Sequence, residues 1–255
     1  MDDADDIVID RQAARAWPAM VVEYARGWVL RSSPGVARSR SNSALPPQRD
    51  AVDGLSAVQE FYARRDQPIL IQVSPAHRHS MLDDHLADRG FQRLSPTLVM
   101  RASLAEEPGL KVGRGRRTGV GGERWPVRLG HRDEAWTRTL QWVDGRSDAA
   151  GELVMDRIPG RTVFARVMDG ATVASVGAGV VDGGWLGVFC MGTRPEYRRR
   201  GTATALLRSL LTWGRDKGAR SAWLQVEEGN TAARKLYEAH GFEESHRYHY
   251  RRSTG

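Results

Sequence analysis

The sequence predicts an α/β fold in which short apolar strands alternate with amphipathic helices. Nearly continuous apolar runs at residues 68–73 and 222–226 are typical of strands buried in such a sheet. Between the strands, apolar residues recur at three- and four-residue steps, which is the spacing of one helix face. Residues 71–91 and 224–242 also share one order of elements: strand, helix, Gly-Phe pair, strand. This internal repeat indicates two related halves, with chance similarity of a common unit as the alternative.

The first half is expected to alternate helices with strands. The helix at 49–65 is the clearest, because Val52, Leu55 and Val58 recur on one face. Gly90 lies where a left-handed C-cap is expected to stop a later helix. In order, the predicted elements are a short helix within 11–25, a hairpin of strands 27–31 and 36–43, the helix at 49–65, a strand at 68–73, a helix at 80–89 and one or two strands in 91–101.

Residues 106–124 differ in composition from the rest of the chain. Lysine and arginine are interleaved there with glycine. Such a stretch buries almost no apolar surface, which favours a flexible linker. A phosphate-binding glycine loop is the alternative, but no convincing strand precedes the stretch and no helix follows it directly. We therefore expect an N-terminal domain at 1–105, a linker at 106–124 and a second domain at 125–255.

The second half is expected to continue the alternation and to end on a long strand. An Asp-Gly pair at Asp169 predicts a hairpin turn, and Gly218 and Gly241 are placed to end helices. The predicted elements are a strand at 127–129, helices at 133–143 and within 147–157, strands at 162–168, 172–181 and 185–191, a helix at 202–217, a strand at 222–226, a helix starting at Asn230 or Thr231, and closing strands in 242–251.

The most informative stretch is 191–207, where a strand is expected to pass through an Arg- and Gly-rich turn into a helix. Gly201 lets the backbone approach an anion closely. A helix that starts near Thr202 directs unpaired N–H groups and the positive end of its dipole at the same place. Arg198, Arg199 and Arg200 add cationic charge. The turn therefore predicts a phosphate site, with a solvated basic turn as the alternative.

Two segments resemble motifs of the GNAT acetyltransferase superfamily. Residues 198–203, Arg-Arg-Arg-Gly-Thr-Ala, are similar to its pyrophosphate motif. Residues 230–242 resemble its Asn, Ala, Leu-Tyr and Gly-Phe segment, and the two motifs together cover about residues 185–245. The resemblance implies two GNAT-like domains built on a central mixed, mostly antiparallel sheet flanked by helices. The N-terminal half would be degenerate and the C-terminal half catalytic.

The resemblance also implies an acetyl-CoA-dependent N-acetyltransferase that transfers the acetyl group directly to a primary amine. Tyr237 would protonate the departing thiolate, with a core aromatic as the alternative role. A backbone N–H near Met191 would polarise the thioester carbonyl. Asn230 would bond the cofactor arm, with a plain helix cap as the alternative. The implied cofactor-binding residues are Met191, Gly192, Thr193, Arg198, Arg199, Arg200, Gly201, Thr202, Ala203, Thr204 and Asn230.

The general base is the least defined part of this site. An amine acceptor is mostly protonated near neutral pH, so the reaction needs a base or a water path. Glu227 and Glu228 follow a buried strand and are the first candidates, with Glu152 and Asp156 behind them, although each can also be a solvated charge. Cys190 is expected to be a buried structural thiol, because it lies mid-strand without a matched His.

Charge and composition indicate which partners and which cell compartment to expect for the protein. The formal net charge of +7 favours an acidic or phosphorylated partner. A single cysteine fits a reducing compartment, and His246 and His249 lack a further ligand set, so no metal is expected. The acidic residues 1–6 do not resemble a signal peptide, and no window is apolar enough for a membrane helix. A cytoplasmic protein is therefore expected.

Two other classes of function compete with the enzyme. A CoA-binding sensor module without turnover is suggested by the lack of an obvious base. A basic nucleic-acid-binding protein is suggested by the charge excess and the arginine-rich linker, but nucleic acid is not the favoured partner. The sequence leaves open whether the acceptor is a small molecule or a protein amine, and whether the chain is a monomer or a homodimer.

Overall fold

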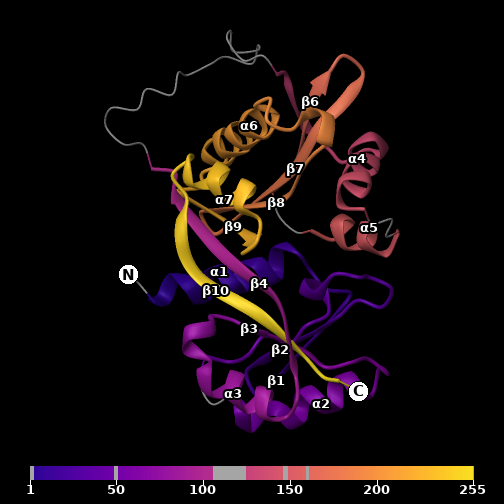
Figure 1. Cartoon of the computed structure of the whole chain (residues 1–255), viewed down its shortest axis with the longest axis vertical. Coiled ribbons are helices and arrows are strands. Elements are labelled where there is room, and N and C mark those ends of the chain that lie inside the picture. The colour runs from indigo at the N-terminus through magenta and orange to yellow at the C-terminus, as the bar shows by residue number, and fades with distance from the viewer. Residues whose placement is uncertain (1–2, 49–50, 106–124, 146–148, 159–160, 255) are drawn as a thin grey trace.

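The computed structural model describes residues 3–48, 51–105, 125–145, 149–158 and 161–254 (Figure 1). Its strands are β1 (Val21–Ala25), β2 (Trp28–Ser32), β3 (Leu70–Val73), β4 (Gln92–Ser103), β5 (Val127–Gly130), β6 (Arg161–Asp169), β7 (Thr172–Asp182), β8 (Trp185–Thr193), β9 (Ser221–Glu227) and β10 (Glu243–Arg252). Its helices are α1 (Asp3–Ala16), α2 (Leu55–Ala63), α3 (Ser80–Asp88), α4 (Glu134–Asp144), α5 (Ala149–Asp156), α6 (Thr202–Asp216) and α7 (Thr231–Glu238). Short 3-10 turns lie at Ser39–Ser41, Val52–Gly54, Ala76–Arg78 and Pro195–Tyr197.

The centre of the molecule is an eight-stranded sheet in the order β3-β10-β4-β9-β8-β7-β6-β5. Its neighbouring strands are antiparallel, except that β8 and β9 are parallel. A separate hairpin of β1 and β2 lies beside it. The expected mixed, mostly antiparallel sheet flanked by helices is thus confirmed.

Helices cover both faces of this sheet (Figure 1). On one face Leu206 and Leu210 of α6 pack in the same hydrophobic cluster as Ala174 of β7. On the other face Trp136 of α4 packs with Val176 of β7, and its indole Nε1 donates hydrogen bonds to two sheet carbonyls at 3.0 and 3.2 Å. Because β7 buries side chains on both faces, its sequence is almost continuously apolar instead of alternating.

A third cluster lies around the β1–β2 hairpin. Trp28 of β2, Phe61 of α2, Ile71 of β3 and Leu82 of α3 are buried together there. This cluster gives the N-terminal segment its own packing and holds the chain that follows β2 close to the large sheet.

The large sheet contains strands from both sides of the expected domain boundary. β4, from the first half, pairs with β9 on one edge and with β10 on the other. Residues 106–124, the expected linker, lie outside the described residues. The division into two domains therefore stays a prediction.

The two units of the sequence repeat are both strand-helix-strand units in the structure. They are β3-α3-β4 and β9-α7-β10, and Gly90 and Gly241 end their helices with φ of +78° and +80°. In the sheet order, β10 lies between the strands of the first unit and β4 lies between the strands of the second. The two units are thus interleaved.

Two local predictions for the first half are wrong. The first helix is α1, which begins earlier than expected, and residues 21–25 form β1 instead of continuing the helix past Pro18. β2 pairs with β1 and not with residues 36–43, because Arg26 and Gly27 both adopt positive φ, at 48° and 79°, and close a tight turn. Asn42 instead organises 36–43 as a loop: its Oδ1 accepts from the Ser33 N–H at 2.7 Å and its Nδ2 donates to the Val36 carbonyl at 2.7 Å.

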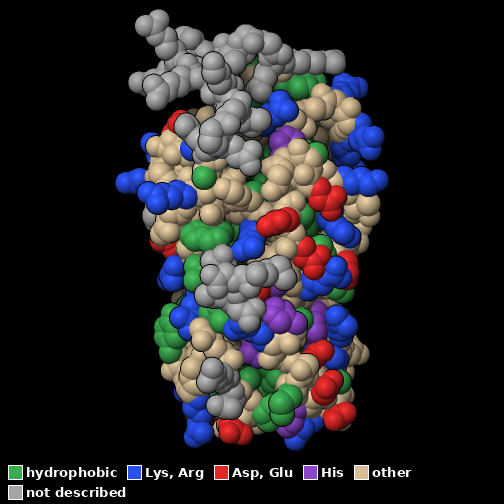
Figure 2. Space-filling model, turned by 90° about the vertical axis from the view of Figure 1, so that its left-hand side faces the viewer, with side chains coloured by type: hydrophobic (Ala, Val, Ile, Leu, Met, Phe, Trp, Pro, Cys, Tyr) green, Lys and Arg blue, Asp and Glu red, His purple; other side chains and the backbone are tan. Residues whose placement is uncertain are grey.

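Charged side chains of both signs cover the surface. On the face shown in Figure 2, Lys and Arg are interspersed with Asp and Glu. Within the described part of the chain, the helices are too short or too polar to cross a bilayer.

Candidate active site

Strands β8 and β9 separate from each other part-way along their length. Their parallel pairing runs from Trp185 opposite Ser221 to Val188 opposite Leu224, although both strands continue beyond these residues. A bulge in β8 accompanies the separation, because the pairing with β7 gains one residue of β8 between Phe189 and Gly192. Beyond Val188 the facing edges of the two strands therefore hold backbone N–H and C=O groups that do not pair with each other.

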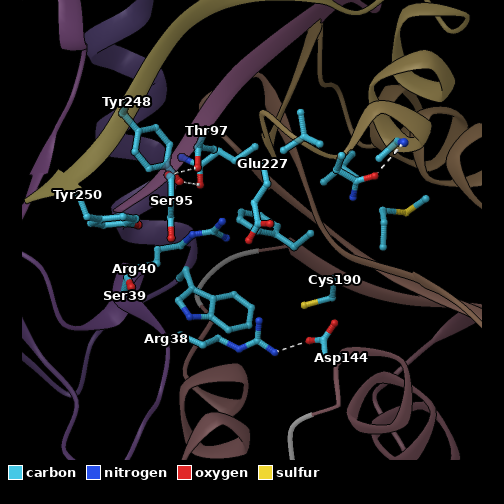
Figure 3. A pocket seen from close by; sticks show the side chains of 18 of the residues that line it. Arg38, Ser39, Arg40, Ser95, Thr97, Asp144, Cys190, Glu227, Tyr248 and Tyr250 are labelled. Carbon is cyan, nitrogen blue, oxygen red and sulfur yellow. Dashed lines mark hydrogen bonds and ion pairs between the residues drawn. The ribbon is translucent and has the colours of Figure 1, made fainter. Parts of the chain in front are cut away.

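A pocket of about 430 Å³ occupies this opening (Figure 3). Both halves of the chain line it. The lining residues are Trp17, 37–40, Ser95, Thr97, Asp144, 188–191, 225–227, Asn230, Ala233, Tyr237, Tyr248 and Tyr250. Four predicted site residues, Met191, Glu227, Asn230 and Tyr237, are thus brought together.

Tyr237 is a buried side chain whose hydroxyl has no hydrogen-bond partner among the described residues. Its ring contacts Phe242 edge-on, with 6.0 Å between the ring centroids. Burial raises the pKa of Tyr237 to about 12. The phenol therefore stays protonated, and it is held against the pocket as a hydrogen-bond donor.

The two predicted glutamates have different surroundings. Glu227 lines the pocket, and no basic side chain in the described ranges forms an ion pair with it. Glu228 is outside this lining and accepts from Arg247 Nη1 at 2.7 Å. Glu227 is therefore the better placed of the two for proton transfer.

Glu152 and Asp156, the reserve candidates for the base, are both bound by Arg132. Neither lines the pocket. Their carboxylates instead tie α5 to the segment that precedes α4.

The turn after β8 exposes a series of backbone donors. Arg199 and Gly201 have φ of +62° and +87°. The first N–H of α6 that finds a backbone acceptor is that of Ala205, which bonds the Gly201 carbonyl at 3.0 Å. The N–H groups of residues 199–204 have no acceptor in the described chain. These donors, together with the dipole of α6, form an anion-binding turn.

The side chains around this turn divide into exposed and inward-facing ones. Arg198, Arg199 and Arg200 are exposed. The Thr193 and Thr202 hydroxyls both bond Ser175 Oγ, at 2.9 and 2.8 Å, and so hold β7, β8 and α6 together. These two threonines therefore offer only their backbone to a ligand.

The remaining predicted binding residues are in the same region. Gly192 is buried close to Val143, and Ala203 and Thr204 are partly exposed in the first turn of α6. Asn230 Oδ1 accepts from the Ala233 N–H at 3.1 Å, which confirms that Asn230 caps a helix while also lining the pocket. Residues 198–204 are beyond the pocket lining, past the end of β8.

A protein-family model described as "Probable histone acetyltransferase Rv0428c C-terminal" matches residues 6–251. The chain belongs to this family. "Uncharacterized N-acetyltransferase YobR" of Bacillus subtilis (strain 168) is 26% identical over 251 residues, which cover 97% of this chain and 98% of the relative. "Probable histone acetyltransferase Rv0428c" of Mycobacterium tuberculosis is 26% identical over 250 residues, 95% of this chain and 72% of the relative.

Solved structures share the fold of this Rv0428c C-terminal family member. A GCN5-related N-acetyltransferase from Kribbella flavida has a TM-score of 0.66 at 14% identity, with 98% of this chain and 96% of that chain covered. A tandem GNAT protein from the clavulanic acid biosynthesis pathway has a TM-score of 0.59 at 12% identity, with 96% and 87% covered. The protein is an acetyltransferase that shares the fold of these GNAT proteins.

In this family member, several pocket residues were not anticipated from the sequence. Trp17, Arg38, Arg40 and Asp144 come from elements far apart in the chain and meet only in the folded structure. For Tyr248 and Tyr250 the sequence indicated only that both side chains lie on the same face, because alternate residues of a strand share a face. Nothing in the sequence indicated that this face turns towards the pocket.

The cysteine and the two C-terminal histidines lie in different surroundings in this Rv0428c C-terminal family member. Cys190 lies within β8 as expected, at the bulge with φ of 53°, and its partly buried side chain lines the pocket. Burial raises the pKa of Cys190 to about 11, which keeps the thiol protonated. His246 bonds Asp10, and His249 bonds Asp83 at 2.6 Å. Within the described ranges no group of side chains is arranged to hold a metal ion.

Proposed function

We propose that this GNAT acetyltransferase uses acetyl-CoA as acyl donor and transfers the acetyl group directly to a primary amine. One observation carries the proposal: unpaired backbone groups lie along the separated edge of β8 and again at residues 199–204, where α6 begins. An extended, amide-bearing arm that ends in a pyrophosphate is complementary to this path, because amides pair with a strand edge and phosphates with helix N–H groups.

The turn supplies the diphosphate end of the site. The N–H groups of residues 199–204 would donate to phosphate oxygens. The exposed guanidiniums of Arg198, Arg199 and Arg200 would add charge-assisted hydrogen bonds. Met191 and the Asn230 side-chain amide would hold the arm between them, since both line the pocket.

The pocket supplies the proton transfers. A backbone N–H near Met191 would stabilise negative charge on the thioester oxygen. The Tyr237 phenol, protonated because its pKa is about 12, would donate a hydrogen bond to the sulfur as charge develops there. Glu227 would accept a proton from the ammonium form of the acceptor, directly or through one water.

We also propose that the chain is a tandem GNAT arrangement with a degenerate first half. The interleaving of β3-α3-β4 with β9-α7-β10 supports it, since related units in equivalent places are expected of a duplicated fold. Among the described residues, only the second half has an Arg- and Gly-rich turn before a helix. One acetyl-CoA site per chain follows.

The experiment that tests the proposed function is a thiol-release assay with acetyl-CoA and a panel of amines. We expect CoA release that depends on both the protein and an amine, together with a mass increase of one acetyl group on that amine. Acetyl-CoA binding without amine-dependent release would instead favour the sensor module. Gly201→Asp is the negative control, because it is expected to disrupt the anion site and leaves the pocket residues in place.

A further inference from the structure

Arg40 places an unneutralised cation in the pocket. It extends from the Ser39–Ser41 turn, lines the pocket, and has its guanidinium 5.8 Å from the centre of the Phe189 ring. No carboxylate in the described chain is within ion-pair distance of it. Its neighbour Arg38 differs, because Arg38 Nη2 bonds Asp144 Oδ2 at 2.7 Å (Figure 3). Arg40 is therefore available to an anionic ligand.

A second guanidinium lies behind this wall of the pocket. Arg31 is fully buried, and its Nε and Nη2 donate only to neutral oxygens, those of Ser43 and Gln72, at 2.8 to 2.9 Å. No described residue accepts from its remaining terminal nitrogen. Burial lowers the pKa of Arg31, and the titratable groups that also act on it are Tyr250, Tyr62, Tyr248 and Arg40, none of which is a carboxylate. Arg31 is thus a buried cation without a counter-ion and Arg40 a partly exposed one, and an anion bound beside Arg40 would stabilise both.

Glu227 gives the same pocket an unpaired anion. It reaches in from the end of β9, while Arg40 reaches in from the opposite half of the chain (Figure 3). The two side chains form no ion pair with each other. A ligand with both an ammonium and an anionic group would satisfy Glu227 and Arg40 together.

We infer that the acceptor is a small primary amine that also carries an anionic group, a carboxylate or a phosphate ester, bound by Arg40. This inference rests on the proposed function, because it names the acceptor of that same site. The pocket of about 430 Å³ would hold the end of the cofactor arm as well as the acceptor, which favours a small acceptor. Tyr248 and Tyr250 lie on the same side of the pocket as Arg40 (Figure 3).

The test compares acceptors that differ only in charge. Glycine, β-alanine and γ-aminobutyrate are assayed against their amides, aminoethyl and aminopropyl phosphates against the corresponding amino alcohols, and a lysine peptide is included as a macromolecular acceptor. We expect kcat/KM for the best anionic amine to exceed that of its neutral partner by about 10- to 100-fold, the usual effect of one charge-assisted contact. The carboxylate and phosphate series then show which anion is preferred.

Variants of Arg40 assign the preference to this side chain. Arg40→Gln should lower kcat/KM for the anionic amine by about 10- to 100-fold and leave the neutral amine within about threefold, so that the discrimination disappears. Arg40→Lys keeps the positive charge and should retain most of the discrimination. This result would show that the effect of Arg40→Gln comes from the lost charge and not from misfolding. Arg11→Gln, an exposed site on α1 with the same change of net charge, should leave the discrimination intact.

Four results would overturn the inference. Equal kcat/KM for charged and neutral partners, or a discrimination that survives Arg40→Gln, removes the role of Arg40 while the acetyltransferase assignment stands. A lysine peptide that outperforms every small anionic amine replaces the acceptor class. Acetyl-CoA binding without CoA release from any amine overturns the proposed function and this inference with it.

Discussion

Two side chains carry out the two proton transfers that we propose for the pocket. Tyr237 is buried, protonated and without a hydrogen-bond partner for its hydroxyl among the described residues, so it is suited to donate. Glu227 carries an unpaired carboxylate in the same pocket, so it is suited to accept. Tyr237 lies in the last turn of α7, and Glu227 is the last residue of β9. Each assignment predicts a different kinetic defect.

Tyr237→Phe should lower kcat about 10- to 100-fold while the affinity for acetyl-CoA changes by less than about threefold. The ring packing against Phe242 is kept and only the hydroxyl is lost. Steady-state kinetics with a titration of acetyl-CoA measure the two effects separately. An unchanged kcat would assign Tyr237 to the core.

Glu227→Gln should lower kcat/KM about 100-fold near neutral pH and recover at high pH, where the amine loses its proton to the solvent. Glu228→Gln should change kcat/KM by less than about threefold, because the Glu228 carboxylate is paired with Arg247 outside the pocket lining. A pH profile of both variants distinguishes the candidates. The reverse ranking would make Glu228 the base.

At the scale of elements, the decisive feature is the junction of β8, the turn and α6. The turn could be predicted from the sequence because its chemistry is local: Gly201 adopts the positive φ, and α6 begins at Thr202 as expected. The separation of β8 from β9 could not be predicted. No glycine or turn pair at Cys190 marks the bulge in the sequence. Only the pairing of β8 with β7 in the folded structure defines it.

Gly201→Asp should weaken acetyl-CoA binding at least about 100-fold, because it places a carboxylate where the phosphates are expected. Gly218→Asp is the matched control at the other end of α6. Both glycines have positive φ, +87° and +90°, and open space at the Cβ position. Both variants should lose about 1 to 2 kcal/mol of unfolding free energy, but only Gly201→Asp should lose binding. Calorimetric titration and thermal unfolding check the pair, and equal binding by both would exclude the turn as the phosphate site.

At the scale of the whole molecule, a buried polar cluster joins the start of the chain to its end. His246 of β10 lies between Asp6 and Asp10 of α1, with ring nitrogens 3.2 Å from a carboxylate oxygen of each. Ser245 bonds Asp6 as well, and Ser74 bonds Asp10. The sequence showed His246 only as one of several alternating residues on the last strand. Its partners come from the opposite end of the chain, and a local sequence pattern does not reveal contacts between residues so far apart.

This cluster predicts a pH-dependent stability. Burial alone lowers the pKa of His246, but its hydrogen bond with Asp10 and the charges of Asp10 and Asp6 outweigh burial and raise the pKa above the ordinary value. A raised pKa in the folded state stabilises the fold fully below about pH 6.5, and this stabilisation is lost as pH rises through the raised value. His246→Gln should therefore cost roughly 3 kcal/mol of unfolding free energy at pH 6 and less at pH 9.

Urea unfolding of wild type and His246→Gln across this pH range measures the difference. His79, whose pKa is lowered by burial and which also faces Asp10, is present in both proteins, so its effect largely cancels. A difference that stays constant with pH would show that His246 is neutral in the folded protein.

The central claim is that the separated β8 edge and the α6 turn together form one acetyl-CoA site in each chain. Calorimetric titration of the 255-residue protein with acetyl-CoA tests it most directly. We predict a single class of site with a stoichiometry of one per chain. The absence of binding, or a stoichiometry of two, would contradict the claim.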